Sequence, residues 1–266
     1  MQRPPWQLWL KAGLGALALG VLLAWWEFTP PGVLGKADAI GYAVCHRIPS
    51  HSFFLGDRPL PLCARCSGTF LGALIGLTFQ LPRGRRALAP SWPFRLVFIA
   101  FALAFVLDGV NSFLSLIPHL PALYPPNNLL RLATGSGFGL GISVLLVPLF
   151  SQVVWTDPCP EPALSQGWQL FGLLGTTALG ALGIASHIPI LVLPLALLSA
   201  LGVLTLLTLC YTLFWILLLK RENSFSDWNA LRGFLLAGLG TALLQIFLVD
   251  GVRFFLTGTW AGFVLP

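Results

Sequence analysis

The chain has 266 residues, of which 56% are hydrophobic and only 9% are charged, and its mean hydropathy is +0.84. Since a soluble domain carries about 25% charged residues, this composition excludes a soluble globular protein. The net charge of +6 includes no long basic run, which excludes an extended nucleic-acid-binding groove. We therefore expect an all-α, polytopic transmembrane helix bundle that forms one membrane domain over residues 1–266, with the lipid bilayer as its surroundings.

Apolar segments of the length that crosses a bilayer, about 20 residues, recur seven times along the chain. The predicted spans are Trp6–Phe28, Leu62–Leu81, Phe94–Ile117, Asn128–Phe150, Trp168–Ile184, Ile188–Leu219 and Asn229–Leu256. No small-residue cleavage site follows the first span, so we expect it to be retained rather than removed as a signal peptide. The fifth is short and glycine-rich, and a six-span arrangement with this segment re-entrant is the alternative. Glycines four residues apart in the second and fourth spans predict close helix packing.

Lysine and arginine predict the orientation, because cytoplasmic loops are enriched in both. They gather at the N-terminus and in the second and sixth connections, as Arg3, Lys11, Arg83, Arg85, Arg86, Lys220 and Arg221. These places share one side, so we predict the N-terminus inside and the C-terminus outside. The first connection, residues 29–61, breaks the pattern, because it is assigned outside but holds Lys36, Arg47 and Arg58. We interpret this exception as a sign of local ion pairing or ligand contact.

The segment Cys45–Cys66 holds three of the five cysteines and two of the four histidines. Cys63 and Cys66 stand three residues apart at a predicted helix start, so their thiols share one face of the helix. The helix dipole and the charge of Arg65 both lower the pKa of a thiol at this place. A thiolate is both a metal ligand and a nucleophile, which leaves two chemical interpretations.

The first interpretation is a metal site. Cys45, His46, Cys63 and Cys66 are the predicted ligands, and zinc is the expected metal, with iron as the alternative. Adjacent residues seldom bind the same ion, so we expect Cys45 with one histidine at most, either His46 or His51. Four protein ligands would make a closed structural site, whereas three would leave a position for water and support Lewis-acid hydrolysis.

The second interpretation is redox chemistry. The outer face of a bacterial membrane is oxidising, so disulfides persist there. A Cys-x-x-Cys pair with a third cysteine in the preceding loop suits the transfer of electrons between thiols and a quinone. A simple structural disulfide, in an accessory or transport protein without catalytic activity, is the third alternative.

Polar residues in the other spans converge on the same side as the cysteines. Ionisable groups inside a bilayer are costly and are functional candidates by default. We predict a polar cavity lined by Asp108, Asn128, Arg131 and Asp250. Arg131 and Arg253 are the expected partners of Asp108 and Asp250, and paired charges that only fix helix register are the alternative interpretation.

Each polar residue has a predicted role. Asp108, Arg131 and Asp250 are the candidate catalytic residues. Asn128 and Arg65 are the candidate cofactor-binding residues.

One sequence pattern resembles a known family. Cys45-His46, Ser52-Phe53, Gly56 and then Leu60-Pro61-Leu62-Cys63-x-Arg65-Cys66-x-Gly68 are similar to an uncharacterised family of bacterial and archaeal integral membrane proteins, a domain of unknown function. The resemblance extends through Asp108-Gly109 and the segment 128–135, and covers roughly residues 40–145. In that family Arg often precedes the Ser-Phe pair, whereas His51 does here, so a site shared by the family does not need His51. The resemblance implies a membrane protein with a common polar cluster and supplies no activity.

These observations lead to one expected function and two alternatives. We expect a multi-pass protein of the cell inner (plasma) membrane with an outward-facing Cys/His metal site, either structural or supporting hydrolysis of a lipid-like substrate. A thiol–disulfide or quinone-linked oxidoreductase is the first alternative. A non-catalytic accessory or transport protein with a structural Cys/His loop is the second.

Overall fold

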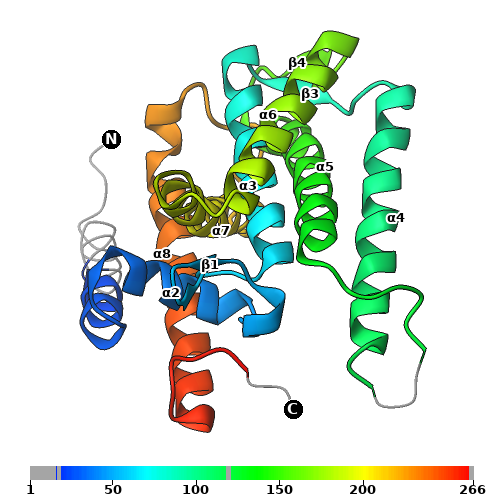
Figure 1. The fold of residues 1–266 in the computed structure, drawn as a ribbon. Coiled ribbons are helices and arrows are strands. Elements are labelled where there is room, and N and C mark those ends of the chain that lie inside the picture. The colour runs from blue at the N-terminus through cyan, green and yellow to red at the C-terminus, as the bar shows by residue number, and fades with distance from the viewer. Residues whose placement is uncertain (1–15, 17–18, 118–120, 264–266) are drawn as a thin grey trace.

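The computed structural model describes residue 16, residues 19–117 and residues 121–263 (Figure 1). After a helix at Leu19–Phe28, the helices are α2 (Gly32–Val44), α3 (Ala64–Gln80), α4 (Trp92–Leu114), α5 (Asn128–Val154), α6 (Gly167–Ala185), α7 (Pro189–Leu218) and α8 (Trp228–Thr257). Single 3-10 turns are η1 (Pro49–His51) and η2 (Leu81–Arg83). The strands β1 (Phe54–Leu55) and β2 (Arg58–Pro59) pair antiparallel, and β3 (Arg86–Leu88) pairs in parallel with β4 (Cys159–Pro162).

The predicted all-α membrane bundle is confirmed. Helices α4 to α8 are each long and apolar enough to cross a bilayer, and they coincide with the last five predicted spans. Helix α3 corresponds to the second predicted span, and its 17 residues rise about 26 Å. Of the first predicted span, Trp6–Phe28, the structure describes the helical part Leu19–Phe28, and most of the rest lies outside the described residues. The number of spans and their orientation stay predictions.

Helices α3 and α5 cross at close range because glycines line their contact. A Cβ atom on Gly139 would lie 2.0 Å from the carbonyl oxygen of Thr69, and one on Gly135 would lie 2.3 Å from that of Arg65. Such contacts exclude any side chain larger than hydrogen. The close approach holds the start of α3, which carries Cys63 and Cys66, against α5.

The substitution Gly139→Ala is therefore expected to destabilise the protein by about 1–3 kcal/mol, since an added methyl group in a filled helix contact forces the backbones apart. Thermal unfolding in detergent micelles measures the effect. Gly175→Ala on α6 is the matched control, because a Cβ atom there would meet no group of the described chain within 4 Å apart from the neighbouring backbone of its own helix. An equal loss in both variants would contradict the packing argument.

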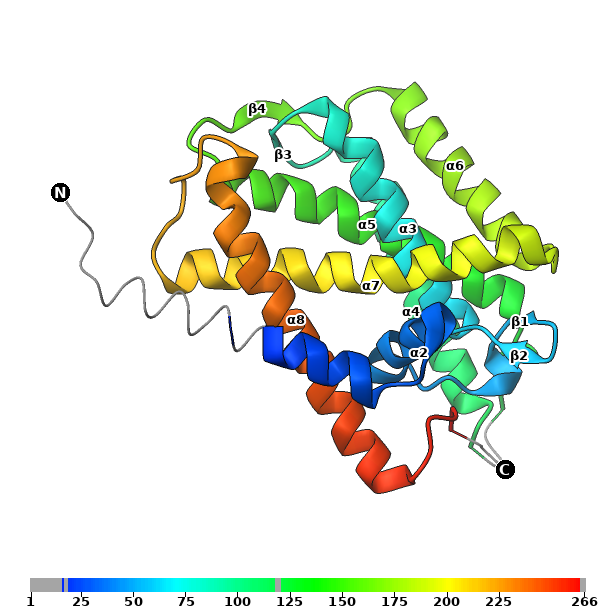
Figure 2. The same ribbon diagram turned by 90° about the vertical axis from the view of Figure 1, so that its left-hand side faces the viewer.

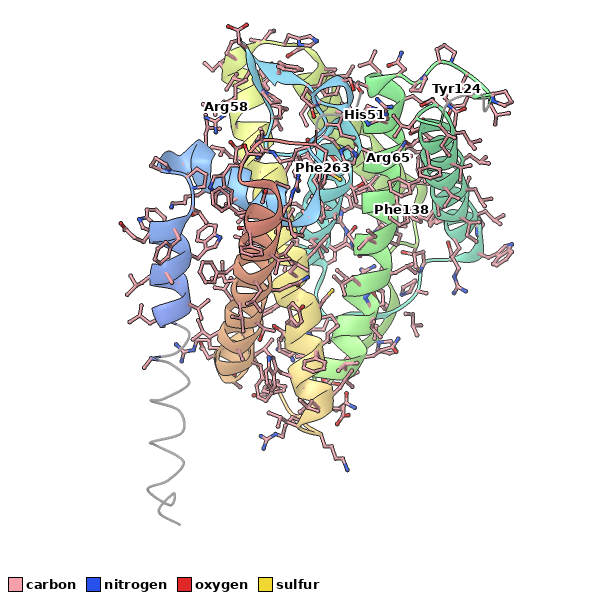
Figure 3. The ribbon with its side chains drawn as sticks, turned by 90° about the horizontal axis from the view of Figure 1, so that it is seen from below. His51, Arg58, Arg65, Tyr124, Phe138 and Phe263 are labelled. Atoms are coloured by element: carbon pink, nitrogen blue, oxygen red, sulfur yellow. The ribbon has the colours of Figure 1, made fainter. Side chains whose placement is uncertain are left out.

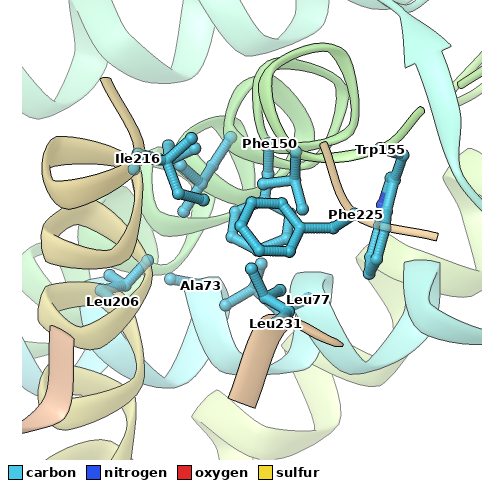
Figure 4. Packing of buried hydrophobic residues seen from close by; sticks show 11 residues of the cluster. Ala73, Leu77, Phe150, Trp155, Leu206, Ile216, Phe225 and Leu231 are labelled. Atoms are coloured by element: carbon cyan, nitrogen blue, oxygen red, sulfur yellow. The ribbon is translucent and has the colours of Figure 1, made fainter. Parts of the chain in front are cut away.

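The end of the bundle far from the cysteines is closed by an aromatic cluster (Figure 4). Phe150 and Trp155 at the end of α5 pack with Phe225 and with Leu231 at the start of α8. The backbone N–H of Asn223, in the connection between α7 and α8, donates to the carbonyl of Val153 at the end of α5 at 2.8 Å. Strand β3, in the connection between α3 and α4, pairs with β4 in the connection that follows α5. The basic second and sixth connections thus lie at the same end, as predicted.

The Cys/His segment lies at the opposite end, where α3 and α5 begin and α4 ends (Figure 2). Helix α2 lies beside α7 and α8, and the β1–β2 hairpin follows it. The first connection is therefore a folded layer with its own helix and hairpin.

Candidate metal centre

Three cysteines come together at this end of the bundle. The sulfur atoms of Cys45, Cys63 and Cys66 all lie within 4.8 Å of one another. Cys45 follows α2, Cys63 is the N-cap of α3, and Cys66 lies in the first turn of that helix. Tetrahedral zinc with Zn–S bonds of about 2.3 Å holds its sulfurs about 3.8 Å apart, so this group needs little movement to enclose an ion.

The local backbone explains how Cys45 reaches the other two thiols. The hairpin turns at Gly56, whose φ is +61°, and returns the chain toward α2. A Cβ atom on Gly41 would lie 1.9 Å from the carbonyl oxygen of Pro61, so glycine is required where the returning strand crosses α2. Arg47 adopts φ +52°, which is unusual for a residue other than glycine and folds the chain sharply behind Cys45.

Two backbone amides point at the sulfur of Cys45. The N–H of Cys63 lies 3.3 Å from this Sγ atom, and the N–H of Arg47 lies 3.4 Å from it. The neighbouring thiols of Cys63 and Cys66, and then these two amides, lower the pKa of Cys45 well below that of an ordinary thiol, although burial opposes the shift. Cys45 is therefore poised to be a thiolate, the form that binds metal or attacks a disulfide.

His46 lies outside the group of three sulfurs. Its Nδ1 accepts a hydrogen bond from the backbone N–H of Ile48 at 3.1 Å, which places the proton of the neutral ring on Nε2. Burial lowers the pKa of His46, so the neutral form is favoured. In this arrangement His46 presents a hydrogen-bond donor rather than a metal-binding lone pair. Its predicted role as a ligand stays a prediction that needs the other tautomer.

The ring of His51 lies 5.5 Å from that of His46. Burial and then the charge of Arg131 lower the pKa of His51 to about 4. The unfolded chain protonates His51 near pH 6.5, whereas the folded protein does so only near pH 4, so stability falls as the pH drops through this interval. We expect the temperature midpoint of thermal unfolding to decrease when the pH is lowered from about 7 to about 5. The decrease should be smaller in His51→Gln, which lacks the titrating imidazole. An unchanged pH dependence in His51→Gln would contradict the assignment.

A cavity of about 260 Å³ opens beside the thiols. Its polar lining includes His46, His51, Cys63, Arg65 and Arg131. Figure 3 views this region with His51, Arg65 and Phe263 labelled close together. Of the four residues predicted to line a polar cavity, Arg131 lines this one, whereas Asp108, Asn128 and Asp250 are not part of its lining in the described chain.

The charges around Asp108 differ from the expected pairing. Asp108 is 1% exposed and pairs with Arg65 rather than with Arg131, and the hydroxyl of Tyr124 donates to its Oδ1 at 3.0 Å. Arg131 instead donates to Asn128 Oδ1 at 2.8 Å. The predicted Asp108–Arg131 pair is wrong, because Arg65 in the first turn of α3 forms the ion pair with this carboxylate.

Asn128 has a bridging position. Its side-chain nitrogen donates to the carbonyl of Ser50 at 3.1 Å, which fixes the Cys/His segment to the start of α5. Its predicted role in cofactor binding stays a prediction.

The structure does not bring Asp250 to this cavity. Asp250 lies on α8, is 1% exposed, and neither of its carboxylate oxygens has a hydrogen-bond partner in the described part of the chain. The expected Asp250–Arg253 pair is also wrong. Arg253 donates to the carbonyls of Tyr42 at 2.5 Å and of Cys45 at 2.6 Å, because the C-terminal carbonyls of α2 lack helical donors and attract a guanidinium group.

The excess of basic residues in the first connection is explained by local pairing, as one of the two interpretations predicted. Arg47 lies 2.9 Å from a carboxylate oxygen of Asp38, and Arg58 pairs with the other oxygen of the same group. Lys36 donates to the hydroxyl of Thr29 at 2.9 Å.

Sequence reasoning missed three contributions to the site. Ser112 accepts a hydrogen bond from Arg65 at 3.0 Å, and its spacing of four residues from Asp108 on α4 was a usable signal. Tyr124 reaches Asp108 from a proline-rich connection that carries no such signal. The segment after α8 covers the cysteine loop, with the N–H of Phe263 donating to the carbonyl of His46 at 3.0 Å.

Comparison with known proteins finds one family and two relatives that are similar to the part of the chain that holds the site. The chain is 25% identical over 117 residues to "Uncharacterized protein MJ1492" of Methanocaldococcus jannaschii, which covers 44% of this chain and 70% of that protein. It is 29% identical over 102 residues to an uncharacterized protein of Methanothermobacter thermautotrophicus, which covers 38% of this chain and 83% of that protein. No solved structure matches the chain. Residues 45–145, which begin at Cys45 and include the cavity's helices, match the family described as "Predicted membrane protein (DUF2085)". The predicted similarity to an uncharacterised family of membrane proteins is confirmed over this segment, and the Cys/His motif as a signature of that family stays a prediction.

Proposed function

We propose that this membrane protein holds one zinc ion in a three-cysteine site formed by Cys45, Cys63 and Cys66. The observation that carries the proposal is the approach of the three sulfurs to within 4.8 Å of one another. The amides directed at Cys45 support it, because N–H groups stabilise the negative charge of a metal-bound thiolate.

The fourth position of the ion is proposed to face the cavity. Cys63 lines both the sulfur group and the cavity, whereas the ring of His46 is held in a donor tautomer by Ile48. Three protein ligands with an open position are typical of catalytic zinc, which activates water or polarises a substrate oxygen. This arrangement favours hydrolysis of a lipid-like substrate over a closed structural site.

The neighbouring polar residues have proposed supporting roles. Arg131 would act at the cavity, and Asp108 would act through Arg65, because the Arg65–Asp108 pair fixes α3 against α4. Asp250 lies elsewhere, so the catalytic role proposed for it depends on a second site at α8. We propose that the protein resides in the cytoplasmic membrane with this end facing outward.

Thiol–disulfide chemistry is the second candidate, and the same observation favours it. A third thiol within reach of a Cys-x-x-Cys pair allows one disulfide to exchange for another. Elemental analysis of protein purified without chelator, beside a thiol count before and after reduction, separates the two. About one zinc per chain supports the metal site. No metal, with two thiols that appear only on reduction, supports the redox alternative, which quinone reduction then tests.

A further inference from the structure

Arg131 is a buried guanidinium group without a carboxylate partner among the described residues. It is 4% exposed, and its hydrogen bonds go to neutral groups, Asn128 Oδ1 at 2.8 Å and Ser112 Oγ at 3.4 Å. Arg131 and Arg65 both donate to Ser112 Oγ, but the carboxylate of Asp108 pairs with Arg65 and accepts a hydrogen bond from Tyr124. A buried charge without a counter-charge costs several kcal/mol, so this position calls for an anion.

The cavity supplies room for that anion. Arg131 and Arg65 both line it, and the Nε atom of Arg65 has no hydrogen-bond partner within the described chain. Two guanidinium groups from different helices match an anion with three or more oxygens, because each planar fork binds two oxygens of a phosphate. A carboxylate offers only one oxygen to each of two arginines, as Asp38 does to Arg47 and Arg58, so a phosphate fills the two forks more completely.

One wall of the cavity is apolar and leads to the outer surface of the bundle. Phe113 and Leu116 line this wall at the end of α4, and they are 63% and 45% exposed. Helix α4 lies at the edge of the bundle and packs on α5, so its outer face is available to the bilayer (Figure 1). A ligand with an anionic head and an apolar tail fits this combination, with its tail along α4.

We infer that the cavity binds the phosphate group of an amphiphile, held by Arg131 and Arg65 next to Cys63. The inference rests on the proposed function in that the zinc site would act on this ligand, and it names the substrate class of that site. The shared chemistry is a phosphate anion, whose source is either a lipid head group or a soluble phosphate.

Isothermal titration in an uncharged detergent tests the inference, with dihexanoyl phosphatidic acid and inorganic phosphate as the two probes. We expect the lipid probe to bind the wild-type protein and Arg131→Gln to weaken this binding about ten- to a hundredfold, as for a lost charge-assisted hydrogen bond. Arg131→Lys should keep part of the affinity. Arg221→Gln is the control, because Arg221 is exposed beyond α7 at the other end of the bundle.

Each outcome decides the inference. Binding of the lipid probe alone assigns a lipid head group, and binding of both probes assigns a phosphate group from either source. No binding of either probe, or equal binding by wild type and Arg131→Gln, overturns the inference. The inference is also overturned if Arg131→Gln loses zinc but keeps its full affinity for phosphate. In that case the charge of Arg131 serves to neutralise the thiolates and does not bind the anion.

The titration is repeated on zinc-free protein so that the two proposals fail separately. Phosphate binding that depends on Arg131 in a protein without zinc keeps the anion site and removes the metal proposal. One zinc ion per chain in a protein that does not bind phosphate keeps the metal proposal and removes the anion site. Protection of Cys63 from alkylation by the bound probe, mapped by mass spectrometry, gives a readout that a folding defect in Arg131→Gln does not imitate.

Discussion

The substitution Cys63→Ser is expected to lower the zinc content of the purified protein from about one ion per chain to below about 0.1, because a serine hydroxyl is a far weaker zinc ligand than a thiolate. The sulfur of Cys63 lies within 4.8 Å of those of Cys45 and Cys66. The backbone N–H of Cys63 also donates to the sulfur of Cys45 at 3.3 Å. The serine variant keeps this amide, so its loss of zinc reports on the sulfur alone. Elemental analysis after dialysis measures the effect.

The chain provides two matched controls for this prediction. Cys210 is exposed on α7, and Cys159 lies in β4 at the opposite end of the bundle. Cys210→Ser and Cys159→Ser should keep the full zinc content. Equal zinc loss in Cys63→Ser and Cys210→Ser would refute the assignment of the site. We also expect the wild-type protein, but not Cys63→Ser, to lose thermal stability when a chelator removes the metal.

The substitution Asp108→Ala is expected to lower the free energy of unfolding by about 3–5 kcal/mol, the usual cost of removing one partner from a buried ion pair. Asp108 is 1% exposed, and the side chain of its partner Arg65 is 20% exposed. Without the carboxylate, Arg65 keeps a largely buried charge and Tyr124 loses its acceptor. Thermal or denaturant unfolding in micelles measures the difference.

A double substitution separates this ion pair from simple packing. Arg65→Met combined with Asp108→Leu removes both charges, so it should recover most of the stability lost in Asp108→Ala. Asp157→Ala is the control, because that carboxylate is exposed in the connection after α5. If the double variant were as unstable as Asp108→Ala, an unpaired charge would not be the cause of the loss.

The sequence by itself determined the class of the protein and the position of its helices. Long apolar segments have few stable forms in a bilayer besides helices, because every backbone polar group must be paired internally. The ranges of α4 to α8 therefore lie within a few residues of the predicted spans. Glycines four residues apart likewise predicted a close helix contact, since only small residues allow it.

The grouping of the three cysteines was only half visible in the sequence. Cys63 and Cys66 had to share a helix face, because helical geometry fixes residues three apart. The approach of Cys45 depends on the left-handed turn at Arg47, on the hairpin and on the crossing at Gly41. These are tertiary contacts that a local pattern does not encode.

Only the tertiary structure decided which charges pair. Arg65 and Arg131 both lie at the end of the bundle that holds Asp108, and the position of α3 brings Arg65 into contact with the carboxylate. Arg253 stands one turn after Asp250 on α8 but extends to the carbonyls at the end of α2, since those acceptors lack helical donors. The length of an arginine side chain lets it serve several partners, so its choice depends on which helices pack together rather than on sequence spacing.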